Sequence, residues 1–330
     1  MADLRLGLLT ATPDLVAAGL LPSLVERLAA NGLRPVAAMP RVYTSAETFM
    51  LYDGKPTHPR SDRSRLHSNW LAPRLFTGGV SLVLLLRSDA PRGDAQMALC
   101  AIKGGSGYRQ ALEMQLRAIS ASCDRCLSLV HCPDDAVGVA HELRLLFGDS
   151  LADWTTSSAA LNRPTLPIEW LPNLVPSQAE EIARTGVLEA WPELLRRGVC
   201  LLAADPLSGV DTELAASLGV GFDSSRAMAT RAEGEAVAPT LWRSLALLKP
   251  LLEQLHQQCV RALNVPVDPR GFARAAARAT LSRILLAACS DRPVDPTLSA
   301  SLVSALASVG SPPSYWEEQR LHVAAAYHAG

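Results

Sequence analysis

Apolar residues in the first 150 positions alternate between short unbroken runs and stretches with helical spacing. The unbroken runs predict strands at 4–9, 33–40, 80–86 and 127–130. Helical spacing, helped by a stop at Gly32 and an N-cap at Asp134 or Asp135, predicts helices at 20–31, 98–102 and 136–147. The order strand, helix, strand, strand, helix, strand, helix predicts an α+β domain with a ferredoxin-like antiparallel sheet and flanking helices.

The rest of the pattern divides the chain. Residues 45–70 are polar and rich in turn formers, which predicts a long mobile insertion between helical pieces. Proline, serine and threonine accumulate at 155–176, so we expect a first domain at 1–150, a linker at 151–176 and a mostly helical second domain at 177–330. The expected elements of that domain are helices at 178–197, 239–263, 271–290, 297–309 and 314–328, with one strand at 198–203.

Composition narrows the class of protein. With 48% hydrophobic and 19% charged residues and a net charge of −1, the chain is not disordered by composition. It also lacks the excess of positive charge that a general nucleic-acid binder needs. The N-terminus does not resemble a secretory leader, and no segment reaches about 18 uncharged apolar residues. We therefore expect a cytoplasmic protein with neither a membrane nor a nucleic acid as its partner.

Seven cysteines, an odd number, favour reduced thiols over a disulfide framework. One cluster, Cys123-x-x-Cys126 followed by His131-Cys132, has donors that suit tetrahedral zinc. A second, separated Cys/His pair is missing. The sequence therefore favours buried free thiols over zinc, and we expect no metal site built from protein side chains.

A series of landmarks along residues 4 to about 148 points to one family. In order they are Thr12-Pro13-Asp14, Gly19-Leu20, Gly32, Thr77-Gly78-Gly79, Gly104-Gly105-Ser106, Arg117, His131-Cys132-Pro133-Asp134 and Glu142. Their order and spacing resemble the nucleoside diphosphate kinase family. The resemblance covers a little under half of the chain.

The resemblance implies a phosphotransferase that works through a phosphohistidine. His131 would be the nucleophile and Glu142 would orient it, while positive charge offsets the charge of the phosphoryl oxygens. The residues implied to bind the nucleotide or its phosphates are Thr12, Trp70, Lys103, Ser106, Arg117 and Asp134. The substrate would be a nucleoside di- or triphosphate or a related small molecule, with Mg²⁺ on its phosphates, and the assembly a homodimer. The ordinary alternatives are a strand-end histidine, a core Trp70 and a solvated Lys103.

Departures from the family pattern support a second hypothesis. Thr12 replaces the family lysine and Cys100 a phosphate-binding arginine, while Ser128 and Pro133 replace an asparagine and a serine. A neutral hydroxyl or thiol does not stabilise an oxyanion as a cation does. The alternative is therefore a catalytically inactive nucleotide-binding or regulatory protein. A third hypothesis places a separate site in the helical half, at 196–206.

Overall fold

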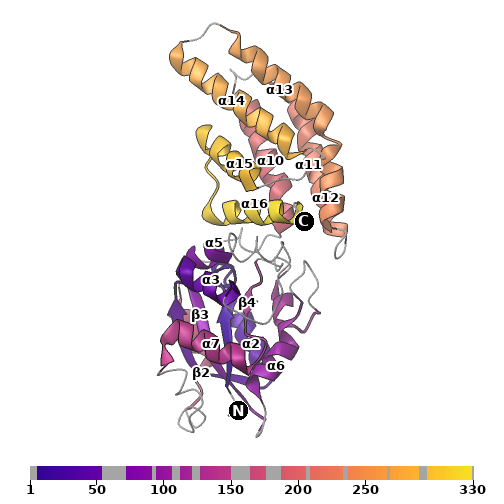
Figure 1. The fold of residues 1–330 in the computed structure, drawn as a ribbon. Helices are drawn as coiled ribbons and strands as arrows, with labels where there is room; N and C mark the ends of the chain where they lie inside the picture. The colour runs from indigo at the N-terminus through magenta and orange to yellow at the C-terminus, as the bar shows by residue number, and fades with distance from the viewer. Residues whose placement is uncertain are drawn as a thin grey trace. The chain divides into compact units, whose positions relative to one another are not determined.

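The computed structural model describes residues 6–53, 72–90, 94–105, 112–120, 127–149, 164–175, 187–205, 209–232, 237–265, 268–289 and 296–328. The chain divides into two compact units, residues 1–184 and 185–330. Figure 1 shows the first unit as the one that carries the sheet. No helix among the described residues is long and apolar enough to cross a membrane.

The first unit contains a four-stranded antiparallel sheet in the order β2-β3-β1-β4, flanked by helices, as predicted. Its strands are β1 (Leu6–Ala11), β2 (Leu33–Arg41), β3 (Ser81–Ser88) and β4 (Val130–His131). Its helices are α1 (Pro13–Ala17), α2 (Leu21–Ala30), α3 (Ser45–Asp53), α5 (Ala72–Thr77), α6 (Ala95–Lys103), α7 (Ala136–Phe147) and the 3₁₀ turns η2 (Leu116–Ile119) and η3 (Ile168–Leu174).

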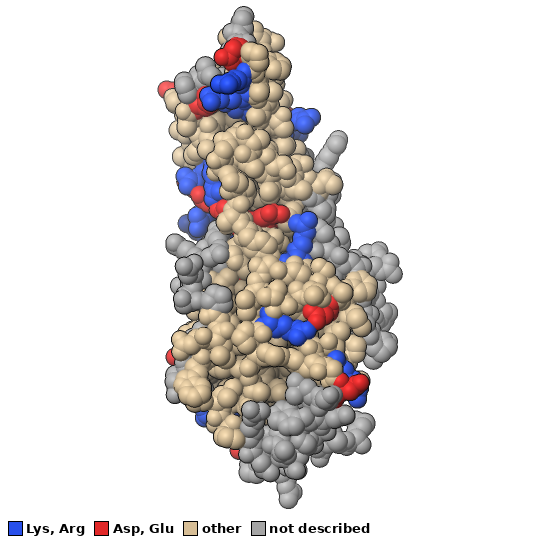
Figure 2. All heavy atoms as spheres, turned by 90° about the vertical axis from the view of Figure 1, so that its left-hand side faces the viewer, with Lys and Arg blue, Asp and Glu red and all other residues tan. Residues whose placement is uncertain are grey.

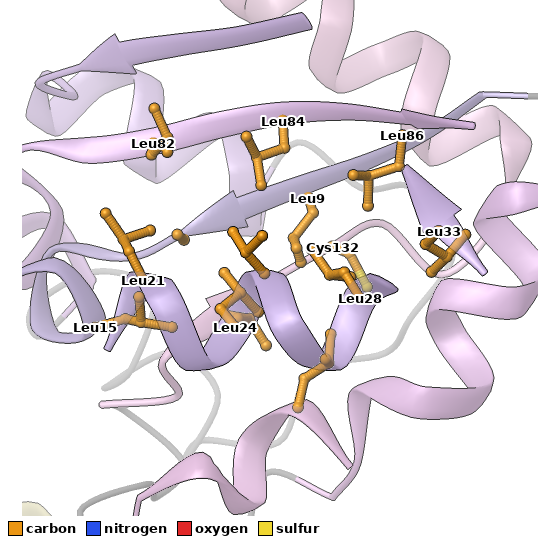
Figure 3. Packing of buried hydrophobic residues seen from close by; sticks show 14 of the residues in the cluster. Leu9, Leu15, Leu21, Leu24, Leu28, Leu33, Leu82, Leu84, Leu86 and Cys132 are labelled. Carbon is orange, nitrogen blue, oxygen red and sulfur yellow. The ribbon is translucent and has the colours of Figure 1, made fainter. Parts of the chain in front are cut away.

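One face of the sheet packs on α2 and α6. Alternate residues of β1 and β3 point to this face because successive side chains of a strand point to opposite sides. Figure 3 shows the leucines of α2 meeting the leucines of the sheet, with Cys132 among them. The cluster includes Leu9, Leu24, Leu28, Leu84, Leu86 and Leu99, all fully buried or nearly so. Burial of this apolar surface is the main stabilising contribution in the unit.

Several predicted boundaries in this unit need correction. The first strand continues two residues beyond its predicted end, to Ala11, while residues 4 and 5 lie outside the described residues, and α1 begins at Pro13. The last strand is only Val130–His131, because Leu129 has a positive φ of 62° that interrupts extended backbone. The start of the predicted mobile insertion forms the regular helix α3, whereas 54–71 lie outside the described residues. Within the segment predicted as a linker, η3 contributes the buried Leu171 to the core of the first unit.

The second unit is helical throughout its described residues. Its helices are α10 (Val187–Ala204), α11 (Thr212–Arg231), α12 (Val237–Ala246), α13 (Lys249–Leu263), α14 (Pro269–Ala288), α15 (Pro296–Ser308) and α16 (Tyr315–His328). The predicted strand at 198–203 is wrong, since those residues continue α10, with Val199 and Leu202 buried and Cys200 exposed. The single helix predicted at 239–263 is two helices, separated at 247–248. Helix α11 was not predicted.

Charged side chains on the face drawn in Figure 2 lie in small groups of both signs, separated by uncharged surface. Ion pairs occur in both units. In the first unit Arg34 bonds Asp89 at 3.0 Å, and in the second Arg196 bonds Glu193 at 3.0 Å. These partly exposed pairs contribute little to stability, because water and salt screen them.

Candidate functional site

His131 lies at the end of β4, the edge strand of the sheet, opposite Thr10 of β1. Its Nε2 atom is 3.0 Å from both carboxylate oxygens of Glu142 on α7. Both residues are buried, with His131 8% and Glu142 1% exposed. The structure therefore brings together the two residues that the sequence predicted as nucleophile and orienting group, eleven positions apart.

The bond to Glu142 fixes the chemistry of the imidazole. A carboxylate accepts hydrogen bonds, so the proton of a neutral imidazole resides on Nε2 and the lone pair on Nδ1. A buried carboxylate also stabilises any positive charge that the ring acquires. This arrangement suits a ring whose Nδ1 attacks an electrophile while Nε2–H stays bonded to the carboxylate.

Tyr43 lies on the same side of the sheet as His131, and it was not among the predicted site residues. Its hydroxyl is 3.1 Å from Thr10 Oγ1, next to the strand position opposite His131. Burial raises the pKa of Tyr43 far above its ordinary value, and the negative charge of Glu142 adds to the effect. The Tyr43 hydroxyl therefore stays protonated, and the side chain next to Thr10 is polar but uncharged. Nothing in the sequence around Tyr43 indicated this position.

Asp14 holds the turn from which β4 begins. Its Oδ2 accepts a hydrogen bond of 3.0 Å from the backbone N–H of Leu129, and its Oδ1 accepts one from the Thr12 hydroxyl. The backbone N–H of Thr12 donates to the Leu129 carbonyl at 3.0 Å. Thr12, predicted as a phosphate ligand, is thus a buried residue whose hydroxyl is bonded to Asp14.

Two cations lie against the backbone on either side of His131. Arg117 donates to the Val130 carbonyl at 3.3 Å and to the Gly104 carbonyl at 3.1 Å, while its Nε is buried without a hydrogen-bond partner. Lys103 lies 3.5 Å from the Cys132 carbonyl and forms an ion pair with Asp134 at 2.8 Å. The structure therefore gathers Lys103, Arg117 and Asp134 around the strand end that carries the histidine.

Residue 132 belongs to a second group on the opposite side of β4. Cys132 points into the α2–α6 face and its thiol hydrogen-bonds Cys100 of α6. That bond and the positive charge of Lys103 lower the pKa of Cys100 to about 6, although burial opposes the shift. The same contact, together with burial, raises the pKa of Cys132. Cys100 therefore carries the negative charge of the pair.

Two predicted ligands, Ser106 and Trp70, lie outside the described residues, as do Cys123 and Cys126 of the zinc hypothesis. Within the described part of the chain, no three or more His, Cys, Asp or Glu side chains are grouped so as to hold a metal. The residues at 196–206 do not form the predicted strand-based site: up to Ala204 they lie in α10, where Arg197 pairs with Glu317 of α16.

The chain was compared with protein-family models, curated proteins and solved structures. No family model matches the chain, and no curated protein does. Among solved structures, the chain is similar to a nucleoside diphosphate kinase from Encephalitozoon cuniculi, with 15% sequence identity and a TM-score of 0.36. The similarity covers 44% of this chain and 90% of that one.

Proposed function

We propose that the first unit transfers a phosphoryl group through a phosphohistidine at His131, from a nucleoside triphosphate or a related phosphate ester. The observation that carries the proposal is the bond from His131 Nε2 to both oxygens of the buried Glu142. In the first step Nδ1 attacks the terminal phosphorus, a P–N bond forms, and the P–O bond to the nucleoside diphosphate breaks. A second nucleophile then takes the phosphoryl group and restores the imidazole.

Glu142 acts in this scheme as a positioning residue. It keeps the proton on Nε2 and offsets the positive charge that the ring develops as the P–N bond forms. Because the carboxylate is already placed and buried, it needs no rearrangement during the reaction, and low-polarity surroundings strengthen its effect. Glu142→Gln should therefore lower the rate of phosphohistidine formation about 10²- to 10³-fold while leaving nucleotide affinity unchanged.

Lys103 and Arg117 are the proposed sources of positive charge for the phosphates. Both contact backbone carbonyls adjacent to His131, and the unpartnered Nε–H of Arg117 is a spare donor in this region. Asp134, ion-paired with Lys103, is the nearby carboxylate. Mg²⁺ prefers oxygen ligands and is usually held by substrate phosphates with one or two carboxylates. Asp134 is therefore the residue that would contact a magnesium ion arriving with the nucleotide, where the metal would neutralise phosphate charge.

The test is to incubate the purified chain with γ-labelled ATP or GTP and Mg²⁺ and to quench in alkali. Phosphohistidine survives alkali but not acid, so alkali-stable, acid-labile label is the expected result. His131→Gln should abolish the label. His141→Gln is the matched control, because His141 lies in α7 next to Glu142 but has no hydrogen-bond partner at its buried Nε2. Label that persists in His131→Gln, or vanishes only in His141→Gln, would contradict the assignment.

A second candidate is a nucleotide-binding protein without catalysis. It is favoured by a specific observation: the two positions where the resembled family has phosphate-binding cations hold a thiol, Cys100, and a hydroxyl already bonded to Asp14, Thr12. Titration calorimetry with the same nucleotides separates the candidates. Nucleotide binding without label, in protein whose His131→Gln variant binds equally well, selects the non-catalytic function.

A further inference from the structure

At the end of β4, two consecutive residues place reactive groups on opposite sides of the backbone. His131 points to α7, whereas the next residue, Cys132, points to the side covered by α2 and α6. Figure 3 shows Cys132 between Leu9 of β1 and Leu28 of α2. Cys100 of α6 packs against the same cluster from the partly exposed edge. The two thiols hydrogen-bond each other although 31 residues separate them in the sequence.

The surroundings of Cys100 favour a reactive sulfur. The side-chain amide of Gln96 donates to its Sγ at 3.6 Å, whereas the protonated thiol itself donates to the Pro133 carbonyl at 3.3 Å. Lys103, one helical turn further along α6, places its ammonium against the Cys132 carbonyl. A thiol that is partly exposed, next to a cation and close to amide and thiol donors matches the environment of reactive cysteines rather than of inert core cysteines.

We propose that Cys100 and Cys132 are a dithiol modification site, which hydroperoxides convert to an intramolecular disulfide. The Cys100 thiolate attacks one peroxide oxygen, the O–O bond breaks, and hydroxide leaves, which gives a sulfenic acid. The Cys132 sulfur then attacks the sulfenic sulfur, the S–S bond forms, and the second oxygen leaves as water. In sum, two thiols and one hydrogen peroxide give one disulfide and two waters, and two electrons pass from sulfur to peroxide.

The order of the two steps follows from the different acidity and exposure of the two thiols. Cys100 is the attacking sulfur because it is the more acidic and more exposed of the two. The contact with Cys100 is the largest cause of the raised pKa of Cys132. Once Cys100 is a neutral sulfenic acid, that contribution disappears and Cys132 loses its proton more readily. The first oxidation therefore makes it easier for Cys132 to lose its proton and to attack the sulfenic sulfur.

Other cysteines in the described residues provide internal controls. Cys259 and Cys289 of the second unit are both about 1% exposed, and burial raises the pKa of each thiol. We expect both to remain reduced under conditions that oxidise the pair.

The test treats the full chain with hydrogen peroxide, blocks remaining thiols with N-ethylmaleimide, digests it with trypsin and identifies cross-linked peptides by mass spectrometry. Trypsin leaves Cys126 and Cys132 on one peptide, residues 126–144, so the experiment is repeated in Cys126→Ser. The expected product joins residues 93–103 to 126–144, lacks two hydrogens, survives in Cys126→Ser and disappears with dithiothreitol. Cys100→Ser and Cys132→Ser should each abolish it, and dimedone should label Cys100 in the latter.

Three outcomes would overturn the proposal. They are a cross-link that disappears in Cys126→Ser, a wild-type chain whose Cys100 is oxidised without any disulfide, and a pair that stays reduced while Cys259 or Cys289 reacts. The wild-type and Cys126→Ser results decide the pairing by themselves, because neither protein alters the two cysteines. A Cys132 variant that folds poorly therefore does not remove the test. The phosphohistidine assay is independent of it, so the two proposals fail separately.

Discussion

The carboxylate of Asp14 and the backbone N–H of Leu129 form a 3.0 Å hydrogen bond between residues 115 positions apart. Leu129 is fully buried and has a positive φ of 62°, a conformation that costs a non-glycine residue about 1–2 kcal/mol. The bond holds this backbone immediately before Val130–His131. A buried side chain at the start of the chain therefore fixes the entry to the strand that carries the histidine.

Replacement of Asp14 tests this relationship. Asp14→Asn exchanges one acceptor oxygen for an amide donor, so the Leu129 N–H and the Thr12 hydroxyl can no longer both donate to residue 14, and the buried negative charge that strengthens both bonds is lost. We expect the free energy of opening of β4 to fall by about 1–3 kcal/mol, measured by native-state hydrogen exchange. Asp89→Asn, which removes a partly exposed ion pair with Arg34, is the matched control and should cost less than about 1 kcal/mol. Equal effects of the two variants would show that Asp14 has no special role.

The pH dependence of Cys100 alkylation follows from its lowered pKa. Only the thiolate reacts with iodoacetamide, so the rate should rise with a midpoint at a pH of about 6 and level off above it. Cys132→Ala removes the donor that is the largest cause of the lowered pKa, so its midpoint should move upward toward the ordinary value of about 8.5. An unchanged midpoint in that variant would mean that the Cys132 contact does not stabilise the thiolate.

Acid should weaken the link between α10 and α16. Burial opposes ionisation of Glu317, but bonds from Arg197 and Ser314 outweigh it and lower the pKa of the carboxyl below 4.5. A lowered folded-state pKa means stability that is present above the unfolded pKa and lost as the pH falls through the folded one. Glu317→Gln should therefore cost about 1–3 kcal/mol of unfolding free energy at pH 7, and the difference from wild type should shrink below pH 4.5.

Chemical denaturation of the chain as a function of pH provides the measurement for Glu317. Glu253→Gln, on the exposed side of α13, is the control and should change the unfolding free energy by less than about 0.5 kcal/mol at every pH. A Glu317→Gln deficit that stays constant from pH 7 to well below 4.5 would contradict the ionic origin of the effect.

Two glycines of α11, Gly219 and Gly221, are separated by one residue but should respond differently to replacement by alanine. A Cβ at Gly219 meets no atom within 4 Å, so Gly219→Ala should raise the free energy of unfolding by about 0.5–1 kcal/mol through helix propensity. A Cβ at Gly221 would lie 2.3 Å from Cδ2 of Leu248, which must move. Gly221→Ala should show no gain in melting temperature. A gain equal to that of Gly219→Ala would mean that Leu248 moves without cost.

Sequence pattern was sufficient for the sheet and for helices with a clear apolar stripe. The runs around Leu84 and Leu33 form the strands β3 and β2, and α7 has the predicted bounds, because the periodicity of apolar residues reflects burial. The pattern failed where apolar residues do not follow one face. Residues 198–203 form an apolar run although only part of it, including Val199 and Leu202, is buried in α10, and α11 is rich in small and polar residues that give a faint stripe.

The candidate site divides in the same way. His131 and Glu142 are predicted together because the family resemblance implies both, and the bond between them joins a strand end to the next helix along the chain. The partners that come from distant segments, Tyr43, Asp14 and Cys100, depend on strand register and helix docking, which no local pattern encodes. The sequence favours a buried free thiol at Cys132 over a zinc ligand, but it gives no indication that Cys100 is its neighbour.

Successive side chains at β4 point to opposite sides. The function of this segment therefore depends more on the number of its residues than on their identity. Deletion or insertion of a single residue between Leu129 and His131 would bring the thiol under Glu142 and turn the imidazole toward Cys100. The histidine and both cysteines would remain in the protein, yet both chemistries would be lost together. Viable variants of this protein should therefore differ here by substitution, and the number of residues from Leu129 to Cys132 should stay constant.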